Sequence, residues 1–201
     1  MSLTTGVIAV QGDVSEHAAM LKAAGRQVGE SVEVREIRQA GIVPECDMLA
    51  MPGGESTAIS RLLNQEGIDS EIVSHVEAGK PLLATCAGLI VAARDAQDDR
   101  VDTLEVLDIT VDRNAFGRQK DSFETQLEIE GLETPFHAVF IRAPVIADVG
   151  ERAQVLAEFE GQPVAVREGP VVGTAFHPEL TDSTALHELV LFDDRPSVVE
   201  Q

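Results

Sequence analysis

The chain has 201 residues, with 35 acidic side chains against 15 basic ones and a formal net charge of −20. A chain of this length can bury a sizeable core without disulfides or metals, so we expect residues 1–201 to form a single domain. The negative charge repels nucleic-acid phosphates and anionic membrane surfaces, which argues against both as partners.

Cysteine usage and hydropathy predict a cytoplasmic protein. Cys46 and Cys86 form no C-x-x-C pair, so neither a disulfide framework nor a structural zinc site is expected. No apolar stretch approaches the roughly 18 residues that a membrane span needs, and the N-terminus lacks a basic segment before its apolar run. The scattered acids indicate a solvated acidic coat similar to that of proteins from salt-loving organisms, with an ordinary acidic surface as the alternative.

The first half of the chain alternates between strand-like and helical patterns. Strands are expected at 6–12, 32–37, 47–54 and 81–87, and helices at 15–25, 56–67 and 68–80. Parallel strands joined by helices have both faces of their sheet covered. The pattern therefore predicts a flavodoxin-like α/β fold, with a central, mostly parallel sheet flanked by helices.

After Asp95 the pattern changes to consecutive strand-like runs. These runs are 104–113, 123–131, 136–144, 153–161, 163–169 and 171–178. Turn signals between several of them predict a mostly antiparallel extension of the sheet. A last helix over 183–194 is expected to pack back on the sheet.

Cys86 lies where a predicted strand turns into a helix, within the sequence ATCAG. In open parallel sheets ligands bind at the carboxyl ends of strands, and a helix N-terminus there favours a thiolate. The arrangement is similar to the G-x-S-x-G nucleophile elbow, with Cys86 replacing serine and Ala84 replacing the first glycine. A lone cysteine is more often a small buried hydrophobe, which is our interpretation of Cys46. Cys86 is a nucleophile only if a base lies near it.

The base is expected in the sequence FHPEL. On an extended strand His177 and Glu179 project from the same face, and Pro178 stiffens the backbone between them. One imidazole nitrogen can then face Cys86 while the other donates to Glu179, which gives a nucleophile, a base and an orienting carboxylate. By itself the sequence HPE is more often a turn at the end of a strand.

Two further groups of residues suit substrate binding. The backbone N–H groups of Gly53 and Gly54 in PGGEST can stabilise an oxyanion, although a lone glycine pair more often makes only a tight turn. Arg113 and Arg142 are cations in an acidic chain, and Arg142 is expected within an otherwise apolar strand. Each arginine is expected to pair with an anion, either a structural carboxylate or that of a substrate.

Six motifs, taken in order, carry a family resemblance: GVIAVQGDVSEH, MPGGEST, ATCAGLI, RNAFGRQKDSFE, FIRAP and FHPEL. Together they resemble the glutaminase subunits of pyridoxal 5′-phosphate synthases, which are class I glutamine amidotransferases. The resemblance implies hydrolysis of L-glutamine to L-glutamate and ammonia. It also implies a partner (β/α)8-barrel synthase subunit, in a large hetero-oligomer, that uses the ammonia to make pyridoxal 5′-phosphate, the vitamin B6 cofactor.

The resemblance further implies roles for individual residues. A catalytic Cys–His–Glu triad falls on Cys86, His177 and Glu179. The expected L-glutamine-binding residues are Gly53, Gly54, Glu55, Arg113, Ile141 and Arg142, and the expected oxyanion donors are Gly54 and Ala87. No cofactor and no metal are expected. His17 is associated with the surface that faces the synthase subunit, or it merely belongs to the first turn of a helix.

Two other functions compete with this interpretation. One is a glutaminase that serves another acceptor, as in the imidazole glycerol phosphate pathway, but the motifs RNAFGRQ and FIRAP argue against it. The other is a flavodoxin-like stress hydrolase, redox sensor or binding module with a reactive cysteine. Such a protein has no need of the HPE pair or of the two arginines.

Overall fold

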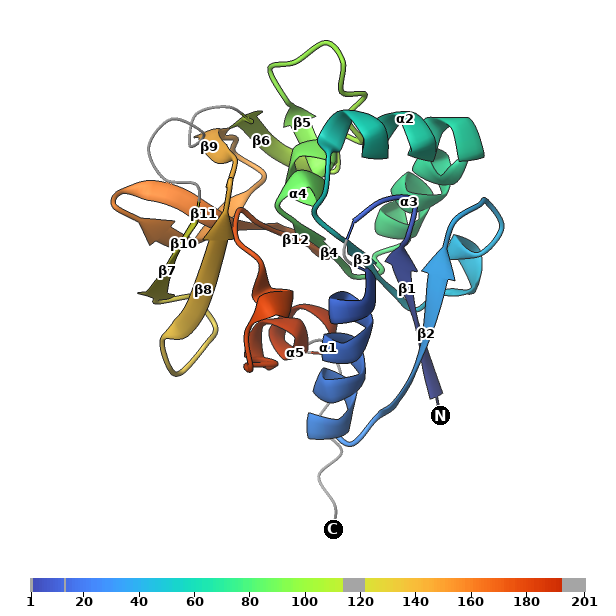
Figure 1. The fold of residues 1–201 in the computed structure, drawn as a ribbon, viewed down its shortest axis with the longest axis horizontal. Helices are drawn as coiled ribbons and strands as arrows, with labels where there is room; N and C mark the ends of the chain where they lie inside the picture. The colour runs from blue at the N-terminus through green and yellow to red at the C-terminus, as the bar shows by residue number, and fades with distance from the viewer. Residues whose placement is uncertain (1, 13, 114–121, 193–201) are drawn as a thin grey trace.

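The computed structural model describes residues 2–12, 14–113 and 122–192, and its centre is a seven-stranded sheet (Figure 1). The strand order is β10-β11-β12-β4-β3-β1-β2. The strands are β1 (Ser2–Ile8), β2 (Ser31–Ile37), β3 (Met48–Met51), β4 (Leu82–Thr85), β10 (Gln154–Phe159), β11 (Gln162–Glu168) and β12 (Val171–Thr174). Parallel pairing joins β2, β1, β3, β4 and β12, and antiparallel pairing adds β11 and then β10.

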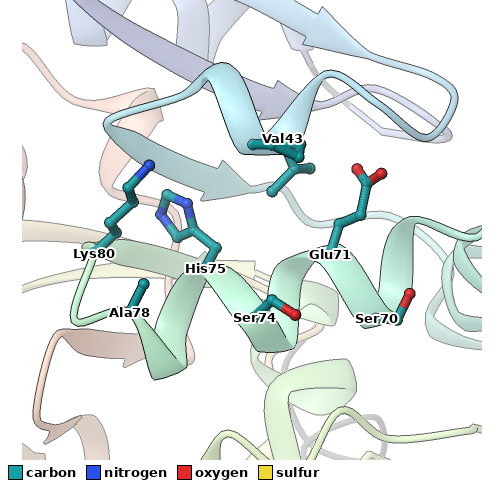
Figure 2. A pocket seen from close by; sticks show the side chains of 8 residues that line it. Val43, Ser70, Glu71, Ser74, His75, Ala78 and Lys80 are labelled. Atoms are coloured by element: carbon teal, nitrogen blue, oxygen red, sulfur yellow. The ribbon is translucent and has the colours of Figure 1, made fainter.

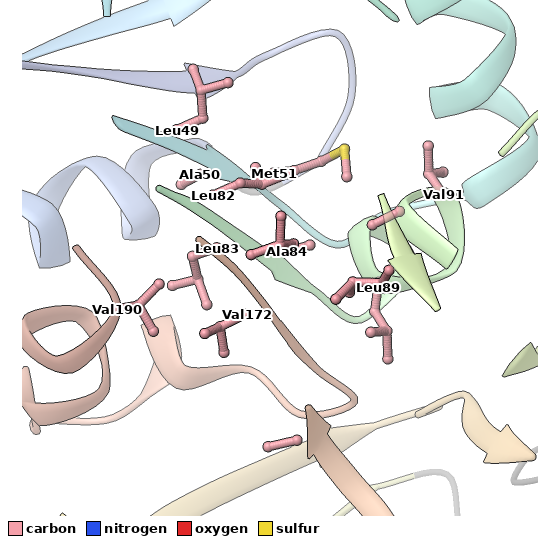
Figure 3. Close-up of a cluster of buried hydrophobic side chains, with 14 of the residues drawn as sticks. Leu49, Ala50, Met51, Leu82, Leu83, Ala84, Leu89, Val91, Val172 and Val190 are labelled. Carbon is pink, nitrogen blue, oxygen red and sulfur yellow. The ribbon is translucent and has the colours of Figure 1, made fainter. Parts of the chain in front are cut away.

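The inner strands of this sheet are buried on both faces. Every residue of β3, β4 and β12 is buried, whereas the edge strand β2 consists mostly of exposed and half-buried positions. Continuous apolar runs such as MLAM and LLAT suit strands that are covered on both sides. Leu49, Leu83 and Val172 belong to the resulting core (Figure 3).

Five helices cover the sheet in the described ranges. They are α1 (Val14–Gln27), α2 (Ser56–Glu66), α3 (Ile68–Glu77), α4 (Ala87–Ala92) and α5 (Ala185–Leu191). α1 packs against α5, and α2 packs against both α3 and α4. The two groups lie on opposite sides of the central strands (Figure 1). A short 3-10 helix, η1 (Val43–Glu45), precedes β3.

The second half of the chain contains a three-stranded sheet and a hairpin. The sheet has the order β5 (Ala93–Asp95), β6 (Leu107–Asp112) and β9 (Val145–Val149), and the hairpin joins β7 (Ser122–Leu127) to β8 (Phe136–Ile141). Most pairings here are antiparallel, as predicted. Two are parallel instead, since β12 pairs with β4 and β6 pairs with β5. The sequence did not indicate β5, because three residues are too few for a periodic signal.

The predicted α/β class is confirmed, with a mainly parallel sheet between helices and an antiparallel extension. Predicted strand boundaries differ from the observed ones by a few residues, most at β1, which begins at Ser2 and ends at Ile8. Within the described ranges, no helix is both long enough and apolar enough to cross a membrane.

Candidate active site

The segments that follow β3, β4 and β12 meet at one edge of the main sheet. Gly53 follows β3, Cys86 follows β4 and His177 follows β12. These strands are neighbours and parallel, so their carboxyl ends share an edge. A methyl group on Gly53 would lie 2.9 Å from Cε1 of His177 and 3.3 Å from Cβ of Cys86. The diglycine turn therefore touches both the imidazole and the thiol-bearing residue.

Cys86 occupies a strained turn between β4 and α4. Its φ of 51° and ψ of −108° are values that residues other than glycine rarely adopt. The turn is held because the N–H of Cys86 donates to the carbonyl oxygen of Thr174 at 2.8 Å. The thiol is largely buried, with 8% of the residue exposed. This is the sharp strand-to-helix turn that the sequence predicts.

Small residues let the turn pack closely. A methyl group on Gly88 would lie 2.2 Å from the carbonyl oxygen of Met51, so α4 can begin against the end of β3 only with glycine there. Ala84 is fully buried in β4, where its neighbour across the strand pair is Gly173 of β12. The turn forms with alanine at the position where the G-x-S-x-G pattern has its first glycine.

His177 and Glu179 are in direct contact. Because a carboxylate can only accept, Nδ1 of His177 donates to Oε1 of Glu179, at 2.7 Å. This contact agrees with the prediction. The extended conformation that we predicted for residues 177–179 is wrong. β12 ends at Thr174, and residues 178–180 form the 3-10 helix η3 (Pro178–Leu180). Proline fits the first turn of such a helix because its fixed φ is helical.

Neighbouring charges set the protonation states of this pair. Burial lowers the pKa of His177, but hydrogen bonding and charge interactions with Cys86 and Glu179 outweigh burial and raise it to about 10. For the Glu179 carboxyl, burial acts in the opposite direction and raises the pKa. Contacts with His17 and His177 outweigh burial and hold this pKa well below its usual range. The arrangement places a positively charged imidazolium between a carboxylate and the thiol. Such a neighbour favours a nucleophilic thiolate.

Ile141 ends β8 and Arg142 follows it, and the carbonyl group of Ile141 faces the thiol. Sγ of Cys86 lies 3.9 Å from the carbonyl oxygen of Ile141, as a weak donor. Arg142 does not lie within the strand, as its apolar surroundings suggested, but follows it with a φ of 46°. Its side chain has no acidic partner among the residues that the structure describes.

Glu55 and Arg113 pair with each other. Arg113 donates to Oε1 of Glu55 at 3.0 Å and to Asp98 at 2.9 Å, so its anionic partners in this structure are protein carboxylates. Glu55 also caps α2 by accepting from the N–H groups of Thr57 and Ala58. No sequence signal singles out Asp98 within its acidic surroundings. Residues 114–121, with the rest of the RNAFGRQ motif, lie outside the described residues.

The two expected oxyanion donors have different surroundings. Ala87 is the first residue of α4, where N–H groups have no partner within the helix. Gly54 has a φ of 143° and packs against Gln11, whose Oε1 accepts from the N–H of Glu55 at 2.7 Å. Gln11 thus holds the diglycine turn, a role that the sequence did not indicate because the two segments are far apart in the chain.

His17 lies in the first turn of α1 and is completely buried. Nε2 of its imidazole is 3.3 Å from Oγ1 of Thr85 and 3.4 Å from Oε1 of Glu179. The side chain therefore points to the active-site edge and not to an exposed surface. No signal in the sequence predicted this contact.

A separate cavity of about 340 Å³ lies at the opposite edge of the sheet (Figure 2). It is lined by residues that precede β3 and β4, and by α3, and it contains none of the predicted site residues. Its polar groups serve the fold, since Nε2 of His75 contacts the carbonyl oxygen of Pro81 at 3.1 Å and Nζ of Lys80 donates to that of Cys46 at 2.8 Å. Burial lowers the pKa of His75 to about 4, so this imidazole is neutral at neutral pH.

Comparison with known proteins assigns the family. The family model described as "SNO glutamine amidotransferase family" matches residues 7–193. The chain therefore belongs to the SNO glutamine amidotransferase family. A family member from Halobacterium salinarum is 68% identical over 98% of this chain and 97% of its own length, and one from Haloquadratum walsbyi is 64% identical over 98% and 97%. Both are named pyridoxal 5′-phosphate synthase subunit PdxT, and they are halophilic relatives.

Solved structures agree with the family assignment. A crystal structure of a glutamine amidotransferase that is 44% identical superposes with a TM-score of 0.83 and covers 92% of this chain and 96% of its own. A second, from Thermotoga maritima, is 16% identical, covers 90% of this chain and 78% of its own, and has a TM-score of 0.63. The second likeness concerns the fold alone. Both likenesses extend over at least 90% of this chain.

Proposed function

We propose that this chain is the glutaminase subunit of a pyridoxal 5′-phosphate synthase, and that residues 1–201 act as one glutaminase domain. It hydrolyses L-glutamine to L-glutamate and ammonia and passes the ammonia to a synthase subunit. The observation that carries the proposal is the meeting of Cys86 and His177 at Gly53, in a chain that belongs to a glutamine amidotransferase family. The printed names of the relatives support the choice of synthase.

In the first half of the reaction the thiolate of Cys86 attacks the carboxamide carbon of L-glutamine. The negative charge that forms on the amide oxygen is stabilised by the N–H groups of Ala87 and Gly54. His177 then gives a proton to the departing nitrogen, which leaves as ammonia, and a γ-glutamyl thioester remains on Cys86. Glu179 keeps the imidazole of His177 oriented through both steps.

In the second half water attacks the thioester carbon. His177, now neutral, accepts a proton from the water, and the C–S bond breaks to release L-glutamate and restore the thiolate. We assign recognition of the amino-acid part of L-glutamine to Gly53, Glu55, Arg113, Ile141 and Arg142. The charge of Arg142 suits the α-carboxylate, because its guanidinium is not engaged by an acid among the described residues.

The acceptor of ammonia is proposed to be a (β/α)8-barrel synthase subunit in a large hetero-oligomer. The resemblance of the six sequence motifs supports this partner, together with the names of the relatives. A cytoplasmic location is proposed as well. It is supported by the free state of both Cys46 and Cys86, which suits a reducing compartment.

A glutamine-mimicking diazoketone, followed by peptide mass mapping, tests the nucleophile. We expect the label on Cys86 and expect L-glutamine to slow the labelling. Cys46 is a matched internal control, because burial raises the pKa of its thiol to about 11 and keeps it protonated and unreactive. Labelling of Cys86 that ignores L-glutamine would instead favour the hydrolase, redox-sensor or binding-module alternative.

A coupled assay tests the acceptor. The chain is mixed with a pyridoxal 5′-phosphate synthase barrel subunit, with L-glutamine as the only nitrogen source, and formation of pyridoxal 5′-phosphate is followed. We expect product to form and expect Cys86→Ala to prevent it. Ammonia release without product would point to a different acceptor.

A further inference from the structure

We propose that His17 is a positioning residue for the glutaminase reaction, which acts through Glu179 and holds that carboxylate in line with His177. The inference rests on the proposed function, because it assigns a role within the same site. His17 does not touch Cys86 in any described contact. Its Nε2 lies near two groups of the site, Oε1 of Glu179 and Oγ1 of Thr85, the residue before Cys86. The site would then be a chain of four side chains, in the order thiol, imidazole, carboxylate, imidazole.

The geometry places two imidazoles on one carboxylate oxygen. Oε1 of Glu179 accepts from Nδ1 of His177 at 2.7 Å and lies 3.4 Å from Nε2 of His17. The second distance is long for a hydrogen bond, and such contacts often tighten when substrate binds. His17 and Glu179 are buried, with 0% and 6% of each residue exposed. Water therefore has little access to replace either contact.

The chemistry of the contact fixes the role of Nε2. A carboxylate only accepts, so a favourable contact requires that Nε2 of His17 carries a proton and points it toward Glu179. Nδ1 of His17 and Oε2 of Glu179 are both buried without a hydrogen-bond partner in the part of the chain that the structure describes. Within that part, His177 donates to this buried charge, and His17 is the second imidazole close enough to do so when its Nε2 proton points to Glu179 and not to Oγ1 of Thr85.

Loss of one donor should change the catalytic imidazole. A buried carboxylate with a single donor either turns toward another group or takes up a proton. In both cases Glu179 stabilises the imidazolium of His177 less, and the imidazole becomes a weaker partner for the thiol. The substrate-binding residues are not touched, so the effect belongs to the chemical step.

Other titratable groups face His17 from the elements around it. His187 of α5 stacks edge-on with a ring-centroid distance of 6.3 Å, Glu16 precedes His17 on α1, and His177 and Glu179 lie across from it. Burial lowers the pKa of His187 to about 3, so this ring is neutral. His187 makes no described hydrogen bond to the site and offers a matched control for the removal of a buried histidine.

Two amide substitutions separate a donor role from a space-filling role. In His17→Gln the side-chain nitrogen reaches the place of Nε2, whereas in His17→Asn it reaches only the place of Nδ1, which does not face Glu179. With the synthase subunit present, we expect His17→Asn to lower kcat for ammonia release about tenfold with KM changed less than about twofold. His17→Gln should keep most of the activity, and so should His187→Leu.

The pH dependence of Cys86 alkylation gives a readout that needs neither L-glutamine nor the synthase subunit. Iodoacetamide reacts with the thiolate, so the rate rises with pH along an acid limb. We expect this limb to move to higher pH in His17→Asn, because a weaker imidazolium supports the thiolate less, and to stay in place in His17→Gln and His187→Leu. Thermal unfolding confirms that each variant is folded at the assay temperature.

A double-mutant cycle that combines His17→Asn with Glu179→Gln decides whether His17 acts through the carboxylate. In that background we expect His17→Asn to add less than about twofold to the loss. An equal, tenfold loss in both backgrounds would overturn the proposal, and so would wild-type kcat and an unmoved acid limb in His17→Asn. If His17→Asn does not fold, alkylation of His17→Phe, which fills the space without a donor, replaces it. Failure of the wild type to release ammonia would reject the proposed function, while the alkylation limb would still decide the role of His17.

Discussion

Two buried carboxylates in this molecule have opposite surroundings. Asp108 of β6 and Glu179 of η3 are 7% and 6% exposed. Both carboxylate oxygens of Asp108 accept hydrogen bonds: Arg94 donates to Oδ1, and the N–H of Arg152 donates to Oδ2 at 3.3 Å. Its own N–H donates to Glu168 at 2.7 Å. Glu179 receives two imidazoles on one oxygen and has no described partner on the other.

Asp108 has a structural role, whereas Glu179 lies where it can assist a reaction. Arginine keeps its proton under all ordinary conditions. The arginine partners of Asp108 therefore hold the carboxylate in place but cannot transfer a proton. An imidazole can gain and lose its proton during a reaction, so His177 beside Glu179 can take part in proton transfer. Both residues are largely buried, although the Asp108 side chain is 10% exposed and that of Glu179 2%. The kind of neighbouring cation decides what each carboxylate can do.

Removal of the thiol should have the largest effect on function. We expect Cys86→Ala to lower ammonia release from L-glutamine by more than about a thousandfold, because the thiol carries the covalent step. The melting temperature should stay close to that of the wild type, since the side chain is small. Cys46→Ala is the matched control and should keep its activity. Glutamine turnover by Cys86→Ala near the wild-type rate would refute the assignment.

A methyl group at the diglycine turn should disturb the same site indirectly. In Gly53→Ala the new carbon would lie 2.9 Å from Cε1 of His177 and 3.3 Å from Cβ of Cys86, closer than side chains normally approach. We expect kcat to fall at least about tenfold as the imidazole moves away from the thiol. Gly41→Ala is the control outside the site: its new carbon has no atom within 4 Å, so the variant strains only its own turn, at a φ of 92°, and should leave kcat unchanged.

The Asp108 cluster should respond in the opposite way. We expect Asp108→Asn to lower the melting temperature by several degrees and to leave kcat within about twofold, because the neutral amide cannot satisfy the surrounding arginines. Asp148→Asn is the matched control: Asp148 contacts Arg94 at 3.3 Å but is exposed, so little stability depends on it. A large loss of kcat in a folded Asp108→Asn variant would end the distinction between the two regions.

The sequence predicted those parts of the fold and site that depend on neighbours along the chain. The alternation of strands and helices, the elbow at Cys86 and the contact between His177 and Glu179 all arise from local patterns. Apart from the expected meeting of Cys86 and His177, the sequence did not indicate contacts between distant segments. Gln11 against the diglycine turn and His17 against Glu179 exist only because α1 and the loop before it pack on the edge that β3, β4 and β12 form.

Some predictions identified the right residues but gave the wrong structural reason for their contacts. His177 and Glu179 meet across a 3-10 turn and not along a strand, because β12 ends three residues before His177. Arg113 has anionic partners as expected, but its partners Asp98 and Glu55 are supplied by the fold. In each case the sequence identified the chemistry of a side chain, while packing decided which atoms it meets.

The most direct test is an NMR titration of the His177 imidazole in the wild type and in Cys86→Ala. Hydrogen bonding and charge from Cys86 contribute to a pKa of about 10 in the intact site. We expect a pKa well above the ordinary 6.5 in the wild type and a clear fall toward it when the sulfur is removed. The same ordinary pKa in both proteins would contradict it, because the imidazole and the sulfur would then not share a site.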